Sequence, residues 1–99
     1  MIRYTTPTYS LRVVGCDLTD MTVYVTFEQR GVSLTIDNPT IELVEGDTLV
    51  TCSMTQEQSA EFSSGVMEVQ VNWIDALGKR CATVAKQIPV IAQLLREVI

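Results

Sequence analysis

One short stretch constrains the fold of this chain more than any other. Between Val66 and Trp73, apolar residues alternate with polar ones: Met67, Val69, Val71 and Trp73 alternate with Glu68, Gln70 and Asn72. A period of two places the two sets on opposite faces of a β-strand with one buried face. A turn-forming piece, Asp75–Lys79, and a second β-type run, Arg80–Val90, follow. The region therefore predicts a core hairpin, with Trp73 on its buried side.

The same alternation recurs through the first half of the chain. It predicts strands at 8–14, 21–29, 32–37, 41–44 and 48–54, with turns at Arg30-Gly31 and Glu45–Asp47. About seven strands separated by closely spaced turns are typical of an antiparallel β-sandwich. We expect an all-β domain whose core includes the hairpin residues together with Val23, Val25, Phe27, Leu34 and Ile36.

Two segments have helical signals. Thr55 followed by Gln58 is a capping-box pattern, and Ser63–Gly65 ends any helix that starts there, so a helix of about two turns is expected, with Phe62 facing inward. In the C-terminal tail, residues 91–99, the apolar residues have the i, i+3, i+4, i+7 spacing of an amphipathic helix: Ile91, Leu94, Leu95 and Val98. A helix of this length is marginal alone, so we expect the tail to dock on another surface.

Length, charge and hydropathy narrow the functional class. The chain has 99 residues, which suits a single domain with an N-terminal arm, 1–7, and the tail, 91–99. No apolar run approaches the ~20 residues of a membrane span, and the net charge of −5 argues against nucleic acid as a partner. The start has no apolar stretch typical of a signal peptide, so we expect an intracellular origin, with synthesis in the cytoplasm.

The side chains provide no recognisable catalytic or metal site. The chain has no histidine, which removes Ser-His-Asp and Cys-His chemistry. Three separated cysteines, Cys16, Cys52 and Cys81, lack the spacing of a zinc site or a disulfide framework. Glu57 and Glu61 share a face of the short helix with no basic residue to organise them, and the loop acids lack an EF-hand spacing. We predict no catalytic residue, no cofactor, no metal and no enzymatic activity.

Several short motifs resemble a known family. The opening Met1-Ile2-Arg3 with Thr5–Thr8, the segment Met54–Glu57, the strand Glu68–Val71 and the ending Glu97–Ile99 resemble small prophage proteins of Gram-positive gut bacteria. Members usually carry Gly at the position of Tyr4. They are similar to the immunoglobulin-like N-terminal domain of siphophage upper baseplate proteins. The resemblance implies an immunoglobulin-like sandwich and a structural part associated with the tail or baseplate of a virion, with no catalytic residues.

The termini are the candidate partner-binding surface. The arm offers Tyr4 and unpaired backbone, which suits strand addition to a neighbour, and Tyr9 follows it. The tail offers four apolar residues for burial: Ile91, Leu94, Leu95 and Val98. Three fates of the tail are open: it caps its own sandwich, it mediates self-association, or it docks on another virion protein.

Two functional classes follow from these features. The first is a non-catalytic phage structural or assembly protein that acts through protein–protein contacts. The alternative is a β-sandwich module that binds carbohydrate or another small ligand. Exposed aromatic residues around a concave sheet face would favour the ligand-binding module. Apolar termini that leave the sandwich favour the assembly protein.

Overall fold

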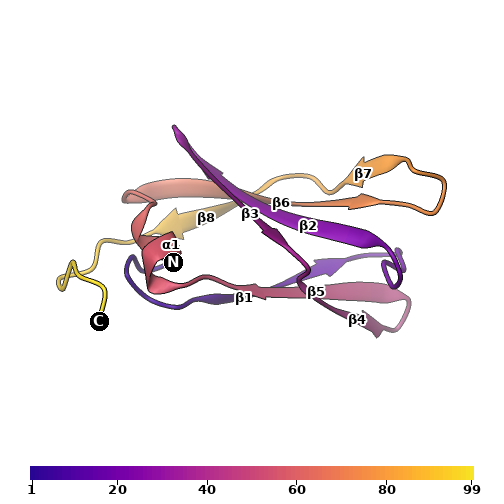
Figure 1. Cartoon of the computed structure of the whole chain (residues 1–99), viewed down its shortest axis with the longest axis horizontal. Coiled ribbons are helices and arrows are strands. Elements are labelled where there is room, and N and C mark those ends of the chain that lie inside the picture. Colours follow the sequence, from indigo (N-terminus) through magenta and orange to yellow (C-terminus); the bar gives the residue numbers. More distant parts are fainter.

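The computed structural model describes residues 1–99 as two antiparallel sheets packed face to face (Figure 1). Its elements, in chain order, are β1 Thr8–Val13, β2 Thr22–Gln29, β3 Val32–Asp37, β4 Thr40–Val44, β5 Asp47–Ser53, α1 Gln56–Ala60, β6 Gly65–Ile74, β7 Arg80–Ala82 and β8 Lys86–Val90. One sheet has the order β1-β5-β4. The other has the order β3-β2-β6, and both β7 and β8 pair with the free side of β6. The interior strands are therefore β5 in the first sheet and β2 and β6 in the second.

The two packed sheets confirm the predicted antiparallel β-sandwich, and their strand order can be compared with that of an immunoglobulin-like fold. In that fold, strands A, B, E and D form one sheet, and C′, C, F and G form the other. Here β1, β5 and β4 take the places of B, E and D, and β3, β2, β6 and β7–β8 take the places of C′, C, F and G. Strand A has no counterpart along β1, so the outer edge of β1 has no partner strand.

A β-bulge divides the last predicted strand into two. Asn72 pairs with Ala82 and Val69 pairs with Lys86, so two residues of β6 lie opposite three residues, 83–85. Thr83 holds the bulge, because its backbone N–H donates to the Val71 carbonyl at 2.9 Å and its Oγ1 accepts from the Val71 N–H at 3.1 Å. The extra residue accounts for eight observed strands where about seven were expected.

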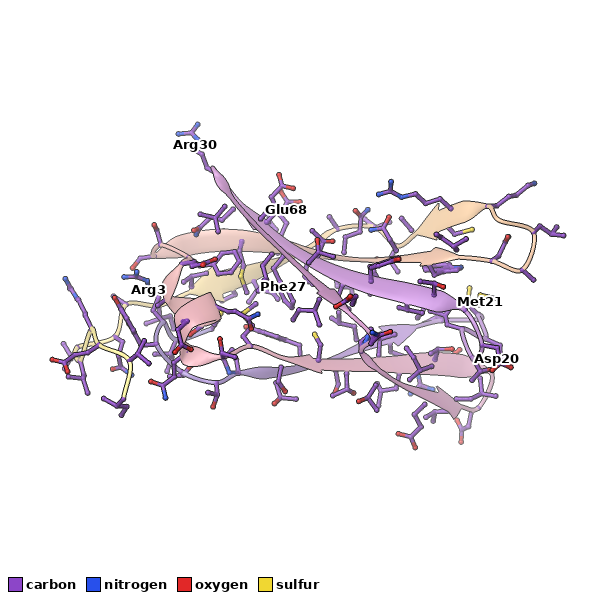
Figure 2. The ribbon with its side chains drawn as sticks, in the orientation of Figure 1. Arg3, Asp20, Met21, Phe27, Arg30 and Glu68 are labelled. Atoms are coloured by element: carbon purple, nitrogen blue, oxygen red, sulfur yellow. The ribbon has the colours of Figure 1, made fainter.

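The core lies between the sheets and follows the predicted alternation. The predicted residues that are fully buried are Val23, Val25, Phe27, Met67, Val69, Val71 and Trp73. Leu34 and Ile36 pack against this cluster but remain half-buried, because β3 is an edge strand. Figure 2 shows Phe27 pointing between the sheets, whereas Arg30 lies at the protruding tip of the β2–β3 hairpin.

The loop between β1 and β2 contributes to the core, which the alternation did not predict. Leu18 is only 1% exposed and closes one end of the sandwich. The fully buried Thr48 holds this loop: its Oγ1 accepts from the Leu18 N–H at 3.0 Å and donates to the Cys16 carbonyl at 2.7 Å. This hydroxyl therefore satisfies two backbone groups that the loop brings close to the core.

The predicted short helix is present with its capping box. The Gln58 N–H donates to Thr55 Oγ1, and the Thr55 N–H donates to Gln58 Oε1. Phe62 is fully buried, as expected. The helix has five residues, and no helix of this chain has the length and apolar character needed to cross a membrane.

The expected C-terminal helix is absent. Residues after Ile91 form bends, and Leu94 is 98% exposed, so no surface packs against the side that a helix would bury. So short a segment does not compensate the cost of helix nucleation without such packing. Instead the chain turns back, and the Gln56 amide pairs with Ile99: Nε2 donates to its carbonyl and Oε1 accepts from its N–H, both at 2.7 Å.

The β4–β5 turn contains a local conflict that a single substitution should relieve. Glu45 and Gly46 form the two-residue loop between the paired residues Val44 and Asp47. The φ values of Glu45 and Gly46 are 52° and 83°. Such a type I′ turn favours Asn at its first position, because L-residues other than Asn and Asp are strained there. Glu45→Asn should raise the free energy of unfolding by about 0.5–1 kcal/mol. Urea denaturation measures this, with the exposed mid-strand change Glu42→Asn as a control that should give no gain; an unchanged midpoint for Glu45→Asn would contradict the turn assignment.

Candidate functional site

The N-terminal arm is bound to its own domain. Ile2 and Ile91 form a parallel bridge, in which the Arg3 N–H donates to the Ile91 carbonyl and the Ile91 N–H donates to the Met1 carbonyl. Arg3 Nη2 also donates to the carbonyl of Ala60 at 2.7 Å. The expectation that the arm offers unpaired backbone for strand addition is therefore wrong, because the end of β8 already uses it.

Tyr4 lies at a tight turn within this arm. Its φ is 63°, a conformation that glycine adopts without strain, and its ring lies 5.3 Å from the Arg3 guanidinium. The side chain is half-buried. Part of its surface is therefore used for contacts inside the domain, and the remainder faces solvent beside α1.

Tyr9 faces the interior of the sandwich. Its ring centroid lies 5.3 Å from that of Phe27, with the two planes tilted by 45°. The hydroxyl is buried without a hydrogen-bond partner, and burial raises the pKa of Tyr9. Little of this side chain is therefore accessible to another protein, although the sequence grouped Tyr9 with the partner-binding residues.

The tail residues are exposed at one end of the molecule, beside α1 (Figure 1). We define the apolar tail as its five large hydrophobic residues: Ile91, Leu94, Leu95, Val98 and Ile99. Leu94 and Ile99 are 98% and 82% exposed, and the others are about half exposed. Isolated exposed hydrophobic residues are ordinary on protein surfaces, but a contiguous group is typical of an interaction site. The four predicted tail residues are therefore all exposed within one short segment, and Ile99 is a fifth exposed hydrophobic residue there.

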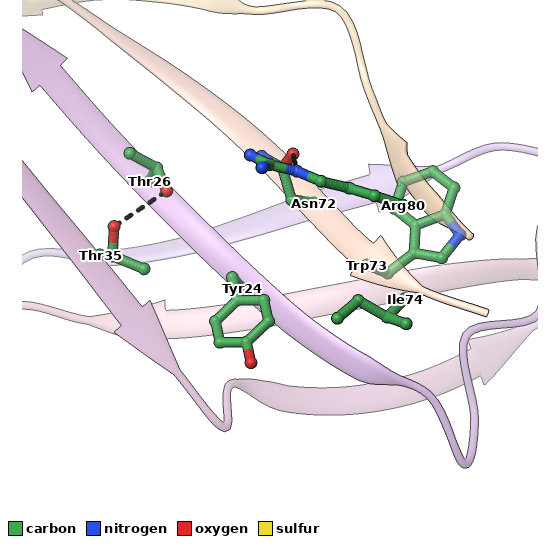
Figure 3. Close-up of a pocket in the computed structure, with 7 residues that line it drawn as sticks. All are labelled: Tyr24, Thr26, Thr35, Asn72, Trp73, Ile74 and Arg80. Atoms are coloured by element: carbon green, nitrogen blue, oxygen red, sulfur yellow. Dashed lines mark hydrogen bonds between the residues drawn. The ribbon is translucent and has the colours of Figure 1, made fainter. Parts of the chain in front are cut away.

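A second candidate site lies on the outer face of the five-stranded sheet. This outer-face hollow has a volume of about 280 Å³ and is lined by Tyr24, Thr26, Thr35, Asn72, Trp73, Ile74 and Arg80 (Figure 3). Its volume is close to the lower limit of about 300 Å³ for small-molecule pockets. The sequence placed Tyr24, Thr26, Thr35 and Asn72 on the exposed face, but the hollow depends on how four strands, β2, β3, β6 and β7, lie side by side. The available signal was an aromatic residue, Tyr24, on a polar face.

The hollow presents mixed hydrogen-bonding groups and a single charge. Arg80 Nε donates to Asn72 Oδ1 at 3.3 Å, and the hydroxyls of Thr26 and Thr35 are 3.1 Å apart. No Asp or Glu lines it, so Arg80 makes it locally cationic within an acidic protein. Such a lining suits a small polar ligand with hydroxyl groups and one negative charge.

The acidic residues mainly hold turns and loops. Asp47 accepts from Arg12 Nε at 2.7 Å and from the Gly15 N–H at 2.8 Å, and these bonds hold the pKa of Asp47 below its usual value. Asp17 accepts from the Thr19 N–H, and its bonds to Thr19 likewise lower the pKa of Asp17. No three of the Cys, Asp and Glu side chains gather as a metal site would require, and all the cysteines are free thiols.

Comparison with protein-family models and with curated proteins finds no match for this chain.

Proposed function

We propose that this chain is a non-catalytic structural or assembly component of a phage particle. It is made in the cytoplasm, joins the tail or baseplate of the virion, and acts by binding other copies of itself or other virion proteins. The resemblance of its motifs to prophage proteins supports the setting. The observation that supports this mode of action is the apolar tail, which extends from the sandwich and is covered by no other part of the chain.

Burial of the apolar tail provides the driving force. A fully buried Leu or Val side chain stabilises a complex by roughly 1.5–3 kcal/mol before the costs of ordering are subtracted. Leu94 and Leu95 together present most of their surface to water. The burial of several such side chains against an apolar partner surface therefore releases enough free energy to drive association.

Full-length protein with Leu94→Ser and Leu95→Ser tests the mode of action. Light scattering after size exclusion should show an assembly for the unchanged protein and a smaller species for the double variant, with equal thermal stability because both side chains are exposed. Leu77→Ser, at an equally exposed residue in the turn between β6 and β7, is the matched control and should leave the mass unchanged. Two identical monomers, together with absence of the protein from phage particles released by a host that carries the gene, would refute the proposal.

The outer-face hollow supports a second candidate function, a module that binds a small saccharide. Tyr24 provides an aromatic ring, Asn72 an amide, and Arg80 a guanidinium for a carboxylate or phosphate on the sugar. Aromatic stacking and forked hydrogen bonds are the usual means of holding a polar ring. This site is separate from the apolar tail, so the two functions can be tested independently.

Amide chemical shifts measured during titration test the hollow. Glucuronic acid should shift the amides around Tyr24 and Asn72 in a saturable way, and Arg80→Ala should weaken binding by about tenfold or more, because it removes the charged donor. Arg30→Ala, at the distant hairpin tip, should not change the affinity. Equal shifts with inorganic phosphate alone would show that the hollow binds anions and does not recognise a sugar. The absence of any shift would refute the proposed ligand site.

A further inference from the structure

The outer edge of β1 has backbone groups available for another strand. Pro7 accepts from the Met54 N–H at 3.0 Å, and this sets the alternation of the β1–β5 ladder. Tyr9, Leu11 and Val13 therefore direct their N–H and C=O groups to β5. Thr8, Ser10 and Arg12 direct theirs away from it, to the side where strand A lies in the complete fold.

A groove runs beside this edge, between the two sheets. It has a volume of about 120 Å³ and is lined by Leu11, Arg12, Val13, Val69, Gln70, Val71, Thr83, Val84 and Lys86. Five of these residues are hydrophobic. Its two charged residues, Arg12 and Lys86, are both cationic, and whereas Arg12 is paired with Asp47, Lys86 has no ion-pair partner in the chain. The groove therefore suits an extended segment that is mainly apolar and carries an acid.

The apolar tail has these properties. Residues 91–99 reach about 30 Å when extended, whereas the six residues of β1 span about 20 Å. In an extended segment, one face carries Leu95, Glu97 and Ile99, so that one apolar side chain lies on each side of the acid. Two hydrogen bonds to Gln56 hold the far end of the tail, and its apolar side chains remain exposed there.

We propose that the tail of one copy adds as a strand to the β1 edge of a second copy. Its backbone pairs with the free groups of Thr8, Ser10 and Arg12, and its apolar side chains cover the groove that strand A would otherwise close. Glu97 meets the cationic rim of the groove. This inference rests on the proposed function, because it identifies the surface that receives the apolar tail.

The arrangement is head-to-tail. The donor surface and the receiving surface are different parts of the chain, so each copy can receive one tail and donate its own. Such contacts produce a ring if the rotation closes and a filament if it does not. A stable assembly of this kind needs no other chain.

Matched proline and alanine variants of the full chain test the receiving edge. Ser10→Pro removes a backbone N–H that faces away from β5, and proline is tolerated on an edge strand at such a position. Ser10→Ala loses the same contact of the hydroxyl with Thr51 but keeps the N–H. We expect the unchanged protein and Ser10→Ala to assemble, and Ser10→Pro to be a folded monomer in light scattering. Thr8→Pro, at the first residue of β1, replaces Ser10→Pro if that variant does not fold.

A mixing experiment identifies the donor. Ser10→Pro retains its tail but has a blocked edge, whereas the Leu94→Ser, Leu95→Ser variant retains its edge but has a weakened tail. Each variant alone should therefore be monomeric, and an equimolar mixture of the two should form a dimer, because one supplies the tail and the other the edge. Ser10→Pro can donate its tail but cannot receive one. Adding it to the unchanged protein should therefore end each growing assembly and limit the mixture to short species. Unchanged assembly of Ser10→Pro, with loss of assembly only in the tail variant, would overturn the β1 edge as the receiver and leave the proposed function intact. A monomeric unchanged protein at all concentrations would overturn both self-association and this inference.

Discussion

Phe27→Ala is expected to lower the free energy of unfolding by about 3–5 kcal/mol. Phe27 is fully buried between the sheets, and its ring contacts that of Tyr9. The substitution removes the transfer free energy of the ring and leaves a cavity that two paired sheets cannot close. Chemical denaturation followed by the fluorescence of Trp73 measures the change. A loss of this size is a large part of the 5–15 kcal/mol typical of a domain.

Two control variants separate packing from other effects at this position. Phe27→Leu keeps most of the apolar volume and should cost much less than Phe27→Ala. Tyr24→Ala removes an aromatic ring from the same strand, but from its outer face, where the side chain is half-buried. Equal losses for Phe27→Ala and Tyr24→Ala would show that the core does not lie on the assigned face of β2.

Thr48→Val is expected to lower the free energy of unfolding by about 2–4 kcal/mol. Valine matches the shape of threonine but cannot bond to the Leu18 N–H or the Cys16 carbonyl. Each buried backbone group left without a partner costs about 1–3 kcal/mol. Denaturation measures the total, and hydrogen exchange at the Leu18 amide should become faster, because the loop loses the group that holds it.

The hydroxyl itself is tested by two further changes. Thr48→Ser keeps both hydrogen bonds and should retain most of the stability. Thr51→Val removes a hydroxyl on the other face of the same strand, where Thr51 bonds to Ser10 at the surface, and should change stability by less than about 0.5 kcal/mol. A loss for Thr51→Val as large as that for Thr48→Val would contradict the role assigned to the buried bridge.

The two proposed surfaces use different parts of the fold. The apolar tail and the open edge of β1 are the surfaces proposed for assembly, whereas the outer-face hollow lies on β2, β3, β6 and β7. A head-to-tail assembly through β1 leaves that hollow accessible. A phage component that repeats in a ring or filament would thereby present one copy of the hollow per subunit, which strengthens weak binding through multivalency.

The sequence alone determined the class of fold and most of its core. Alternation of period two depends only on neighbouring residues, so Met67, Val69 and Val71 could be assigned to the buried face before any pairing was known. The capping box of Thr55 and Gln58 is likewise local, and so are the turns at Arg30-Gly31 and Glu45-Gly46. Strand boundaries agree within one residue, except in the last predicted strand, Arg80–Val90, which the bulge divides into β7 and β8.

Only the tertiary structure decided which of these elements meet and what remains uncovered. The burial of Leu18 depends on Thr48, a residue from a distant strand, and the bulge near Thr83 depends on the register of β6 against two partners. The tail had the spacing of a helix, but helix formation needed a packing surface that the fold does not provide. From the sequence, the backbone of the arm was expected to be unpaired, but in the structure it forms hydrogen bonds with Ile91. Local periodicity carries no information on such long-range pairing, so the open edge of β1 and the outer-face hollow emerged only when the strand order was known.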